Sequence, residues 1–372
     1  EMFALKQLME RLGSPHIDCR QDGTALHPRF GRSSYLFNAS IEGIEAADAL
    51  LVIGSNPRVE APVLNARIRK RWRMGGFPIG VVGEAADLTY GYDYLGAGPD
   101  TVAELVAGRG DFLEYLQKAE RPLILVGQGA LARPDGEAIL RMAARLAANV
   151  GAVGEAGLGF SVLHTAAARV GGLDIGFVPG ESGMAAPEIL SAAGAGDIEV
   201  LFLLGADEIE TAALGKAFVV YIGSHGDAGA HRAYVILPSA AYTEKSAIYV
   251  NTEGRVQMTN RAGFPPGDAR EDWSILRALS DVLGHKLPYD SLRELRAALY
   301  EAHPHLADQE EIAPGSADDI RRLAGAEPGS HSREPFRSPI RDFYLTNPIA
   351  RASAVMAECS SLHLGPRAQA AE

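Results

Sequence analysis

The sequence predicts an α/β fold of doubly wound, mostly parallel sheets with helices on both faces, followed by an extended C-terminal tail. The first observation is a recurring unit in which a short apolar run is followed by glycine. It occurs at 50–53, 79–82, 123–126, 201–204 and 219–222. These runs do not alternate between apolar and polar residues, which is typical of parallel strands buried on both faces. The second observation is that helical patterns lie between the runs, as βαβ units require.

Length and composition set the scale of the fold. A chain of 372 residues is long enough for two or three domains. We expect a first α/β domain over 1–118, a second over 119–305, and the tail over 306–372. The net charge of −12 disfavours nucleic acid as a partner, because nucleic-acid binding needs clustered Lys and Arg. No apolar run approaches the ~20 residues of a membrane-spanning helix, so direct membrane insertion is not expected.

The chain begins with a helical pattern at 1–12 that has neither an initiator Met nor the features of a signal peptide. We therefore expect a fragment of a longer subunit. The two cysteines, Cys19 and Cys359, lie near opposite ends of the sequence. Two cysteines so far apart, with no export signal, are typical of reduced thiols in a cytosolic-type compartment.

Several helices can be placed from periodicity and end signals. A basic helix is expected over 59–72, and an amphipathic helix starts at 135–137 and runs to about 148. Asp268 and Glu271 have the spacing of a capping box for the helix that contains Trp273.

The tail differs in composition from the rest of the chain. Residues 308–341 are rich in Pro, Gly, Ser and charge and lack core-forming residues, so we expect them to extend over a surface rather than to pack in a core of their own. Asn347 and Pro348 then supply an N-cap and a first-turn proline for a last short helix over 349–358.

The stretch 234–257 joins two strand-like runs through a polar segment. The first run, 234–237, must end at Pro238, because proline offers no backbone donor to a central strand. The second run, 247–250, is closed by a turn in which Gly254 can adopt positive φ. A strand that ends in a polar loop suits the carboxyl edge of an α/β sheet, where ligands usually bind.

This stretch also carries a family pattern. Leu237-Pro238, TEK at 243–245 and YVNTEGR at 249–255 together resemble the molybdopterin oxidoreductase superfamily. The motif YTEKS at 242–246 resembles one branch of this superfamily, the large iron–sulfur subunit of NADH:quinone oxidoreductase, respiratory complex I. Further segments are similar to the same branch: GSNPR at 54–58, NARIRK at 65–70, DLTY at 87–90, REDW at 270–273 and DFYLT at 342–346. The similarity covers nearly the whole chain.

The resemblance implies a molybdopterin oxidoreductase-like fold with a structural role. In active members of the superfamily, the loops that correspond to 54–58, 205–208 and 242–251 line the pterin pocket. By resemblance, five residues sit at vestigial positions of that pocket: Asn56, Arg58, Asp207, Glu244 and Asn251. The complex I branch is understood to keep the fold without the cofactor, so the resemblance implies neither a catalytic residue nor a metal or pterin ligand here.

The resemblance also implies cofactors and partners elsewhere. The [2Fe–2S] and [4Fe–4S] clusters of the subunit would lie in an upstream part, and the partners would be other subunits of the NADH-oxidising peripheral arm. The chain would support electron transfer from NADH to quinone on the cytoplasmic side of a bacterial inner membrane, a source that the abundance of Ala, Gly and Arg favours. The matrix side of the mitochondrial inner membrane is the alternative location.

Two patterns that could bind ligands have simpler interpretations. GQGALA at 127–132 fits G-x-G-x-x-A after a strand, but no acidic residue follows at the ~20-residue spacing that holds a ribose. Pro134 also interrupts the start of the helix, so we interpret the pattern as a tight structural turn. His225 and His231 flank a glycine-rich loop, but a metal site needs three or four convergent donors. We interpret both as loop residues.

Two alternative functions remain open. The chain could be a fragment of an active molybdopterin oxidoreductase such as a formate dehydrogenase, against which the wording at 242–246 and 342–346 argues. It could also be a free-standing nucleotide-binding enzyme, against which the weak pattern at 127–132 argues. We expect no redox centre in this chain, since a conventional iron–sulfur cluster takes about four thiolates and only Cys19 and Cys359 are present.

Overall fold

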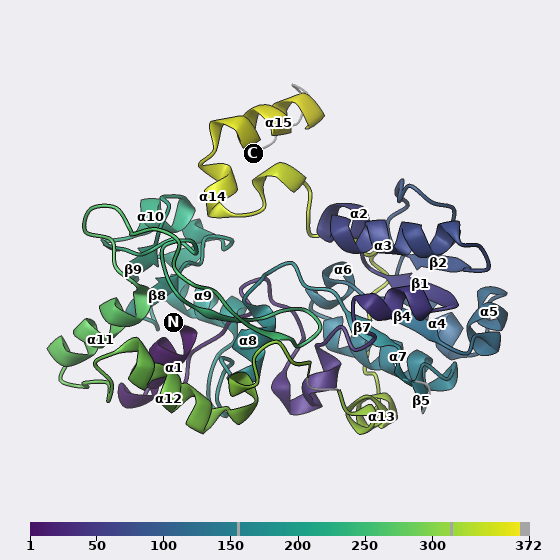
Figure 1. The fold of residues 1–372 in the computed structure, drawn as a ribbon, viewed down its shortest axis with the longest axis horizontal. Coiled ribbons are helices and arrows are strands. Elements are labelled where there is room, and N and C mark those ends of the chain that lie inside the picture. The colour runs from purple at the N-terminus through teal and green to yellow at the C-terminus, as the bar shows by residue number, and fades with distance from the viewer. Residues whose placement is uncertain (155–156, 313–314, 365–372) are drawn as a thin grey trace.

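The computed structural model describes residues 1–154, 157–312 and 315–364. Two parallel sheets lie at opposite sides of the molecule, and the C-terminal segment passes between them and over the top (Figure 1). The larger sheet comprises β1 (Ala49–Ile53), β2 (Ile79–Val82), β3 (Asp93–Gly96), β4 (Pro122–Val126) and β7 (Phe160–Val162). The smaller sheet comprises β8 (Val200–Leu204), β9 (Phe218–Gly223) and β10 (Val235–Pro238). Two short hairpins pair β5 (Val153–Gly154) with β6 (Gly157–Leu158) and β11 (Ile248–Val250) with β12 (Val256–Met258).

The larger sheet is doubly wound, as the sequence predicts. Its strand order is β3-β2-β1-β4-β7 and all four pairings are parallel. The apolar run of β1 is buried on both faces, because Leu51 and Ile53 join one core while Leu50 and Val52 join the other. Continuous apolar runs therefore identified β1, β2 and β4. They did not identify β3, which is largely exposed, or the three-residue β7.

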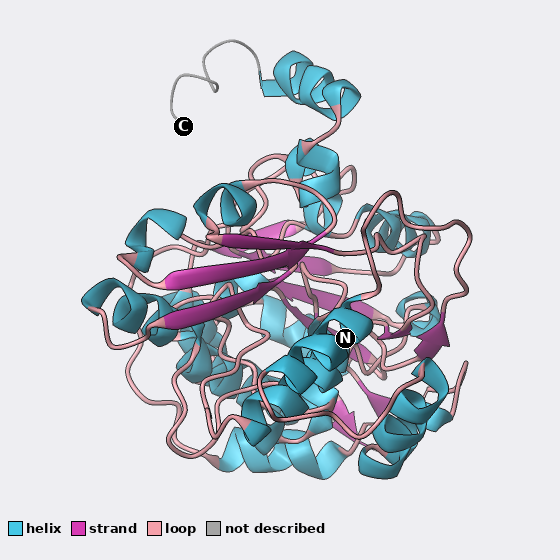
Figure 2. Ribbon diagram, turned by 90° about the vertical axis from the view of Figure 1, so that its left-hand side faces the viewer, coloured by secondary structure: helices cyan, strands magenta, loops and turns pink. Residues whose placement is uncertain are grey.

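Helices cover both faces of the larger sheet, and others surround the smaller one (Figure 2). They are α1 (Met2–Arg11), α2 (Pro57–Glu60), α3 (Pro62–Arg73), α4 (Pro99–Val106), α5 (Phe112–Lys118), α6 (Gln128–Leu131), α7 (Gly136–Asn149), α8 (Arg169–Asp174), α9 (Ala186–Ala195), α10 (Ala228–Arg232), α11 (Asp272–Val282), α12 (Leu292–Ala302), α13 (Ala317–Gly325), α14 (Pro348–Arg351) and α15 (Ala354–Leu364). In the described part of the chain, no helix combines the length and apolar character needed to cross a membrane.

Three helices differ from the sequence prediction. The last helix, expected over 349–358, is divided into α14 and α15. The expected basic helix over 59–72 is divided into α2 and α3 at Ala61, because Pro62 cannot continue the preceding turn and starts a new helix instead. The expected capping box at Asp268 is wrong: α11 begins at Asp272 with Glu271 as its N-cap. The N-cap predicted at Asn347 is present, and its side chain accepts a hydrogen bond from the amide of Ala350.

The smaller sheet has a single central strand. Its order is β10-β9-β8, so β8 and β10 are both edge strands. The expectation that 201–204 is buried on both faces is wrong, since Leu203 is the one fully buried residue of β8 and Val200 is 50% exposed. Burial on both faces holds for β9, where Val219 through Ile222 are buried. Pro238 ends an edge strand, a position where its missing N–H is tolerated.

The position expected for a domain boundary, 118/119, lies inside the larger sheet. Strand β4, which follows this position, pairs with β1, which precedes it, from Ala49 opposite Pro122 to Ile53 opposite Val126. Strand β7 also belongs to the larger sheet. The larger sheet therefore draws on both expected domains, and the division of the chain into folding units stays a prediction.

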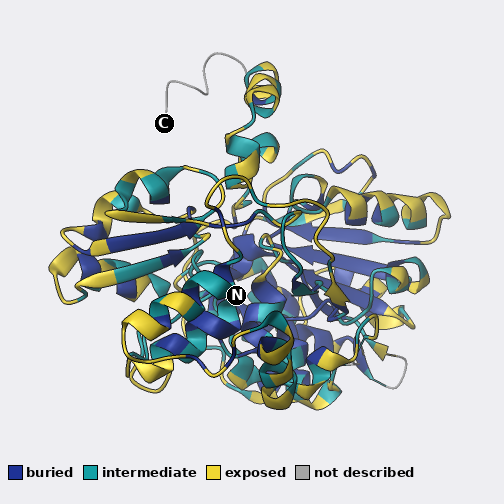
Figure 3. Ribbon diagram, turned by 60° about the vertical axis from the view of Figure 1, so that its left-hand side comes forward, coloured by how far each residue is buried: buried dark blue, intermediate teal, exposed yellow. Residues whose placement is uncertain are grey.

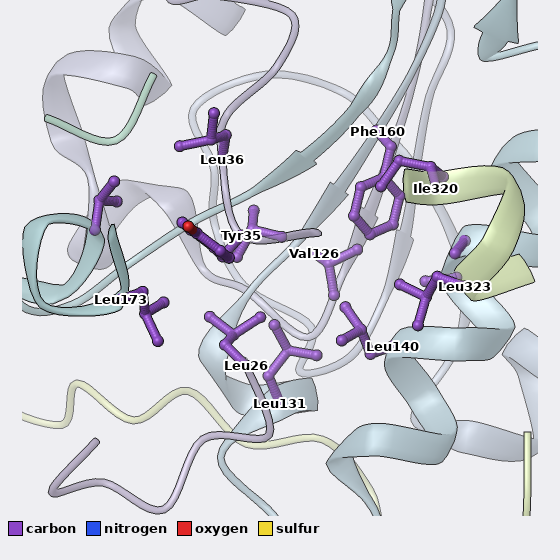
Figure 4. Packing of buried hydrophobic residues seen from close by; sticks show 14 of the residues in the cluster. Leu26, Tyr35, Leu36, Val126, Leu131, Leu140, Phe160, Leu173, Ile320 and Leu323 are labelled. Atoms are coloured by element: carbon purple, nitrogen blue, oxygen red, sulfur yellow. The ribbon is translucent and has the colours of Figure 1, made fainter. Parts of the chain in front are cut away.

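The tail extends over the surface, but it also contributes to the core. Helix α13 packs along α7, and Figure 4 shows Ile320 and Leu323 beside Leu140 and Phe160. Phe336, further along the tail, is 1% exposed. The expectation that 308–341 lacks core residues is therefore wrong at these positions, because isolated apolar residues are buried one at a time against the preformed body.

Candidate functional site at the crevice of the larger sheet

The carboxyl ends of β1, β2 and β4 lie side by side and form the edge at which ligands bind in doubly wound sheets. Each of these strands is followed by a glycine, Gly54, Gly83 or Gly127. Because the strand order reverses between β1 and β4, the topological switch point lies between the loops that begin at Gly54 and Gly127. We call the space at this point the crevice.

The glycine pattern at 127–132 brings protein backbone segments close together. A Cβ placed on Gly127 would lie 2.4 Å from the Cβ of Ser55, and one placed on Gly129 would lie 2.2 Å from the carbonyl oxygen of Arg337. Both distances are too short for any residue with a side chain. The glycines are thus required by the approach of the β1 loop and of the tail, which agrees with a structural turn.

Glu60, the last residue of α2, is the centre of a hydrogen-bond network in the loop that follows β1, which we call the β1 loop. Its carboxylate accepts hydrogen bonds from the Ser55 hydroxyl at 2.7 Å, from the Asn56 amide at 2.8 Å, and from the Ser338 hydroxyl at 2.8 Å. Burial raises the pKa of Glu60 above its usual value, against the opposing effect of these three donors. The polar groups at the end of β1 are therefore engaged by the protein itself.

The tail crosses the crevice as an ordered segment, residues 332–338, which we call the strap. The Phe336 amide donates to the carbonyl of Ala97 at 2.9 Å, and the Phe336 side chain is fully buried. The Ser338 amide and the Arg337 guanidinium each donate to Glu84 at 3.2 Å. These contacts fix the strap across the ends of β1 and β2.

Arg133 holds the preceding part of the strap. Its guanidinium lies 5.4 Å from the centre of the Phe336 ring and donates to the carbonyl oxygens of Glu334 and Pro335. It also donates to the Ser332 hydroxyl at 2.8 Å, and Asp135 accepts the Ser332 amide at 2.8 Å. The ion pair with Arg133 holds the pKa of Asp135 well below its usual range.

Two of the five residues predicted for a vestigial pocket, Asn56 and Arg58, lie at the start of α2. The Asn56 side chain caps this helix by accepting from the Arg58 amide at 3.2 Å. The Arg58 guanidinium turns outward to Asp87, 2.6 Å away, and about half of its side chain is exposed. The hydrogen bonds of these two side chains are thus made within α2 and to Asp87, and not to the strap.

Asp207 lies after β8 and is buried. It accepts hydrogen bonds from the Tyr221 hydroxyl at 2.7 Å and from the Gly229 amide. Burial and this hydrogen bond together raise the pKa of Tyr221. Asp207 therefore fixes the loop after β9, which carries His225, to the end of β8. His231 belongs to α10 and is exposed.

Glu244 and Lys245 organise the polar segment after β10. The Glu244 carboxylate accepts from the Ala241 amide at 2.9 Å and so closes a turn. Lys245 lies 2.6 Å from Asp272 at the start of α11 and 3.3 Å from Glu1. The YTEKS segment is therefore attached to two helices through its lysine.

Asn251 organises the NTEGR turn between β11 and β12. Its Oδ1 atom accepts from the amides of Glu253 at 3.1 Å and Arg255 at 2.8 Å. Glu253 is 7% exposed and accepts from the Ile41 amide at 2.8 Å. Asn251 thus shapes a turn that is held to Ile41 through Glu253. Of the five predicted residues, Asn56 and Arg58 share one hydrogen bond, while Asp207, Glu244 and Asn251 belong to three separate networks.

Two family models match separate parts of the chain. Residues 1–282 match the model of the molybdopterin oxidoreductases. The chain belongs to this family. Residues 311–359 match a second model, which describes the C-terminal region of a subunit of NADH-ubiquinone oxidoreductase, and this range includes α13, the strap and most of the terminal helices. The family resemblance found in the sequence motifs is therefore confirmed.

Three curated relatives are named as mitochondrial NADH dehydrogenase or NADH-ubiquinone oxidoreductase proteins. The chain is 41% identical over 363 residues to the mitochondrial NADH dehydrogenase [ubiquinone] iron-sulfur protein 1 of Solanum tuberosum, covering 97% of this chain and 47% of the relative. It is 42% identical to the mitochondrial NADH-ubiquinone oxidoreductase 78 kDa subunits of Neurospora crassa and Candida albicans, with 97% of this chain covered in each case and 48% and 49% of the relatives. The chain spans about half the length of the curated relatives it matches.

Solved structures agree on the fold. Acetylene hydratase from Pelobacter acetylenicus superposes with a TM-score of 0.57 at 14% identity, covering 92% of this chain and 65% of that one. A chain of the formyltransferase/hydrolase complex from Methylorubrum extorquens, solved with methylofuran, gives a TM-score of 0.53 at 16% identity, covering 76% and 87%. At such low identity these likenesses concern the fold alone.

Sequence reasoning missed the residues that fill the crevice of this family member: Glu60, Arg133, Phe336 and Ser338. A signal for one of them was present, since Phe336 is the only aromatic residue between 308 and 341. No spacing rule links it to Arg133, which lies about two hundred residues earlier. Among the described residues, no group of three or more His, Cys, Asp or Glu side chains is arranged to hold a metal ion.

Proposed function

We propose that this chain is a structural, cofactor-free region of the iron–sulfur subunit of NADH:quinone oxidoreductase, and that electrons pass through clusters located elsewhere in the assembly. The observation that carries the proposal is the strap. Residues 332–338 fill the crevice with the chain's own atoms, at the place where doubly wound sheets bind their ligands. The second family model, which includes the strap, bears the name of NADH-ubiquinone oxidoreductase.

The crevice residues do not fit a dinucleotide form of the pterin cofactor. A pyrophosphate needs hydrogen-bond donors and room beside the glycine loop. Here Glu60 takes the donors of Ser55 and Asn56, and the Arg337 carbonyl lies where a phosphate would approach Gly129. Both groups present acceptor oxygens, which do not bind phosphate oxygens, and the Phe336 ring fills the adjacent apolar space.

The cysteine chemistry supports the same proposal. A cluster takes about four thiolates, whereas this chain has Cys19 and Cys359. Burial raises the pKa of the Cys19 thiol to about 12, so this side chain is a poor source of thiolate. One relative's name includes the words iron-sulfur protein. The [2Fe–2S] and [4Fe–4S] clusters that the sequence resemblance implies would then belong to the part of the subunit outside this chain.

The partners and the location follow from the same proposal. The chain would contact other subunits of the peripheral arm, on the cytoplasmic side of a bacterial inner membrane or on the matrix side of the mitochondrial one. The competing function, a fragment of an active molybdopterin oxidoreductase such as a formate dehydrogenase, is disfavoured by the names of the relatives and by the strap. It would require the strap to leave the crevice.

The test is the cofactor content of the folded chain. Residues 1–372 are expressed in a host that loads an active molybdopterin enzyme, which serves as the positive control for cofactor supply. Iron, molybdenum, tungsten and zinc are measured by mass spectrometry, released pterin by fluorescence, and folding by a cooperative thermal transition. We expect less than a tenth of an equivalent of each. Stoichiometric metal or pterin in the folded chain would overturn the proposal and favour the active-enzyme alternative.

A further inference from the structure

Helix α15 has the composition of a buried helix but lies on the outside. Its sequence, AVMAECSSLHL, contains Glu358 and His363 among residues that are otherwise apolar, Ser or Cys. A helix without a polar face is normally buried. Here Ser360 is the one residue of α15 that is buried. Figures 1, 2 and 3 agree that α15 projects from the body, and Figure 3 colours much of it as exposed.

The projecting segment is anchored in a defined position. We call residues 342–364 the terminal hairpin. Arg351 of α14 donates to Glu208 at 2.8 Å and also to Asp227, which ties the hairpin to the carboxyl end of the smaller sheet. Within the hairpin, the Ser360 hydroxyl donates to Asp342 at 2.6 Å. These contacts hold α15 in one orientation, so the same side of the helix always faces outward.

The outward face of α15 is an apolar stripe with one charge at its centre. Val355, Glu358 and Leu362 are spaced i, i+3 and i+7, which places them on one side of a helix. At 100° per residue, this side is opposite Ser360, which is buried against Asp342 within the terminal hairpin. Val355 is 66% exposed and Leu362 is 80% exposed, and Glu358 is exposed between them.

We propose that this stripe is the docking surface for a different polypeptide of the same assembly, one that presents an apolar groove with a Lys or Arg facing Glu358. The proposal rests on the function proposed above and names the surface that would serve it. Charge complementarity selects the partner, because a carboxylate at the centre of an apolar interface requires a cation. The second family model, for the C-terminal region of the NADH-ubiquinone oxidoreductase subunit, covers residues 311–359 and thus most of the stripe.

A second copy of this chain does not satisfy the same requirement. Two copies would meet through a two-fold axis, so the same face would be used on both sides. Glu358 lies near the middle of α15 and would then face the Glu358 of the other copy. Like charges in an apolar interface are unfavourable, and the net charge of −12 adds repulsion between copies.

The experiment places variants in the chromosomal gene and follows assembly. Leu362→Glu puts a charge into the stripe, Glu358→Lys reverses its central charge, and Glu358→Gln removes that charge. Matched controls are Val282→Glu and Val63→Glu, which introduce the same charge at apolar helix residues that are 85% and 77% exposed. Membranes are separated by native electrophoresis, stained for NADH oxidation, and probed for this chain.

We expect Leu362→Glu and Glu358→Lys to reduce the fraction of chain in the NADH-oxidising band at least tenfold, Glu358→Gln to reduce it less, and both controls to match the wild type. Thermal transitions of the purified variants should all equal that of the wild type, since none of these side chains is buried. Equal incorporation of Leu362→Glu and the controls would overturn the docking surface. A Glu358→Lys effect no larger than that of Glu358→Gln would overturn the cationic partner.

Two other outcomes separate the remaining possibilities. If the purified chain forms a dimer in light scattering that Leu362→Glu dissociates, the occupant is a second copy and the proposal is wrong. If the wild-type chain is itself missing from every NADH-oxidising band, the proposed function fails, and the docking proposal fails with it. The wild-type result thus distinguishes failure of the function from failure of the surface.

Discussion

Replacing Phe336 by alanine should release the strap from the crevice while leaving the larger sheet intact. The ring is 1% exposed and lies under the guanidinium of Arg133. Truncating a buried Phe to Ala typically destabilises by about 3–5 kcal/mol, and the lost cation–π contact is included in that range. The remaining contacts of the strap are hydrogen bonds worth on the order of 1 kcal/mol each. Since about 1.4 kcal/mol corresponds to a factor of ten, the ratio of docked to undocked strap should fall at least about 100-fold.

Hydrogen exchange measures this change at individual amides. The amides of Ser332, Phe336 and Ser338 donate to Asp135, Ala97 and Glu84, so each is protected only while the strap is docked. Because exchange occurs from the undocked strap, the exchange rates of these amides should rise in Phe336→Ala by the same factor as the undocked fraction, on the order of 100-fold. Amides of β1 and β4 should keep their wild-type rates.

A matched variant gives the reference for this measurement. Phe264→Ala removes the same atoms from a side chain that is 79% exposed, so the strap amides should exchange as in the wild type. Unchanged protection in Phe336→Ala would show that the ring does not hold the strap. Equal acceleration in β1 would show that the ring supports the sheet itself, which would refute the account of a separately docked segment.

Three further substitutions test the packing of other regions. Leu203→Asp buries a charge in the smaller sheet and should lower the free energy of unfolding by several kcal/mol. Val200→Asp, at a half-exposed residue of the same strand, should leave it nearly unchanged. Equal shifts of the melting temperature in the two variants would contradict the description of β8 as an edge strand. Burial raises the pKa of Glu60, so the folded chain keeps a proton that the unfolded chain releases, and the free energy of unfolding falls as pH rises from about 4.5 through the raised pKa. In urea titrations at several pH values, Glu60→Gln should make this dependence on pH weaker. The same dependence in Glu60→Gln and in the wild type would refute the raised pKa of Glu60. Lys245→Met leaves the buried carboxylate of Asp272 without its cation and should lower the free energy of unfolding by about 3–5 kcal/mol, so a loss well below that range would mean that the pair is not buried in solution.

The sequence predicted the three central strands of the larger sheet, β1, β2 and β4, because strands that are buried on both faces are apolar throughout. A strand such as β1 must be apolar at every position when both faces are covered, and it is. The same pattern misled at 201–204, where the run is equally apolar but the strand lies at an edge. Composition records that a strand is hydrophobic, whereas the position in the sheet depends on which other strands pair with it.

The strap could not be predicted because its partners are remote. The hydrogen bond from Ser338 to Glu60 joins residues that are 278 positions apart in the sequence, and the one from Arg133 to Glu334 joins residues that are 201 positions apart. Periodicity and capping rules act within a few turns, so they give no information about such pairs. The tail's low apolar content indicates an extended segment, which holds for the strap but not for helix α13. One buried ring is enough to fix the strap against a body that is already folded.

The glycines of the crevice explain why a ligand motif and a structural turn look alike in sequence. Gly127 and Gly129 are needed because another group approaches the backbone closely, and the motif records this requirement alone. In dinucleotide-binding folds the approaching group is a phosphate. Here it is the β1 loop and the carbonyl of Arg337, which lies 2.2 Å from where a side chain on Gly129 would begin. A glycine pattern after a strand is therefore evidence of close approach, and the identity of the approaching group has to come from the atoms that surround it.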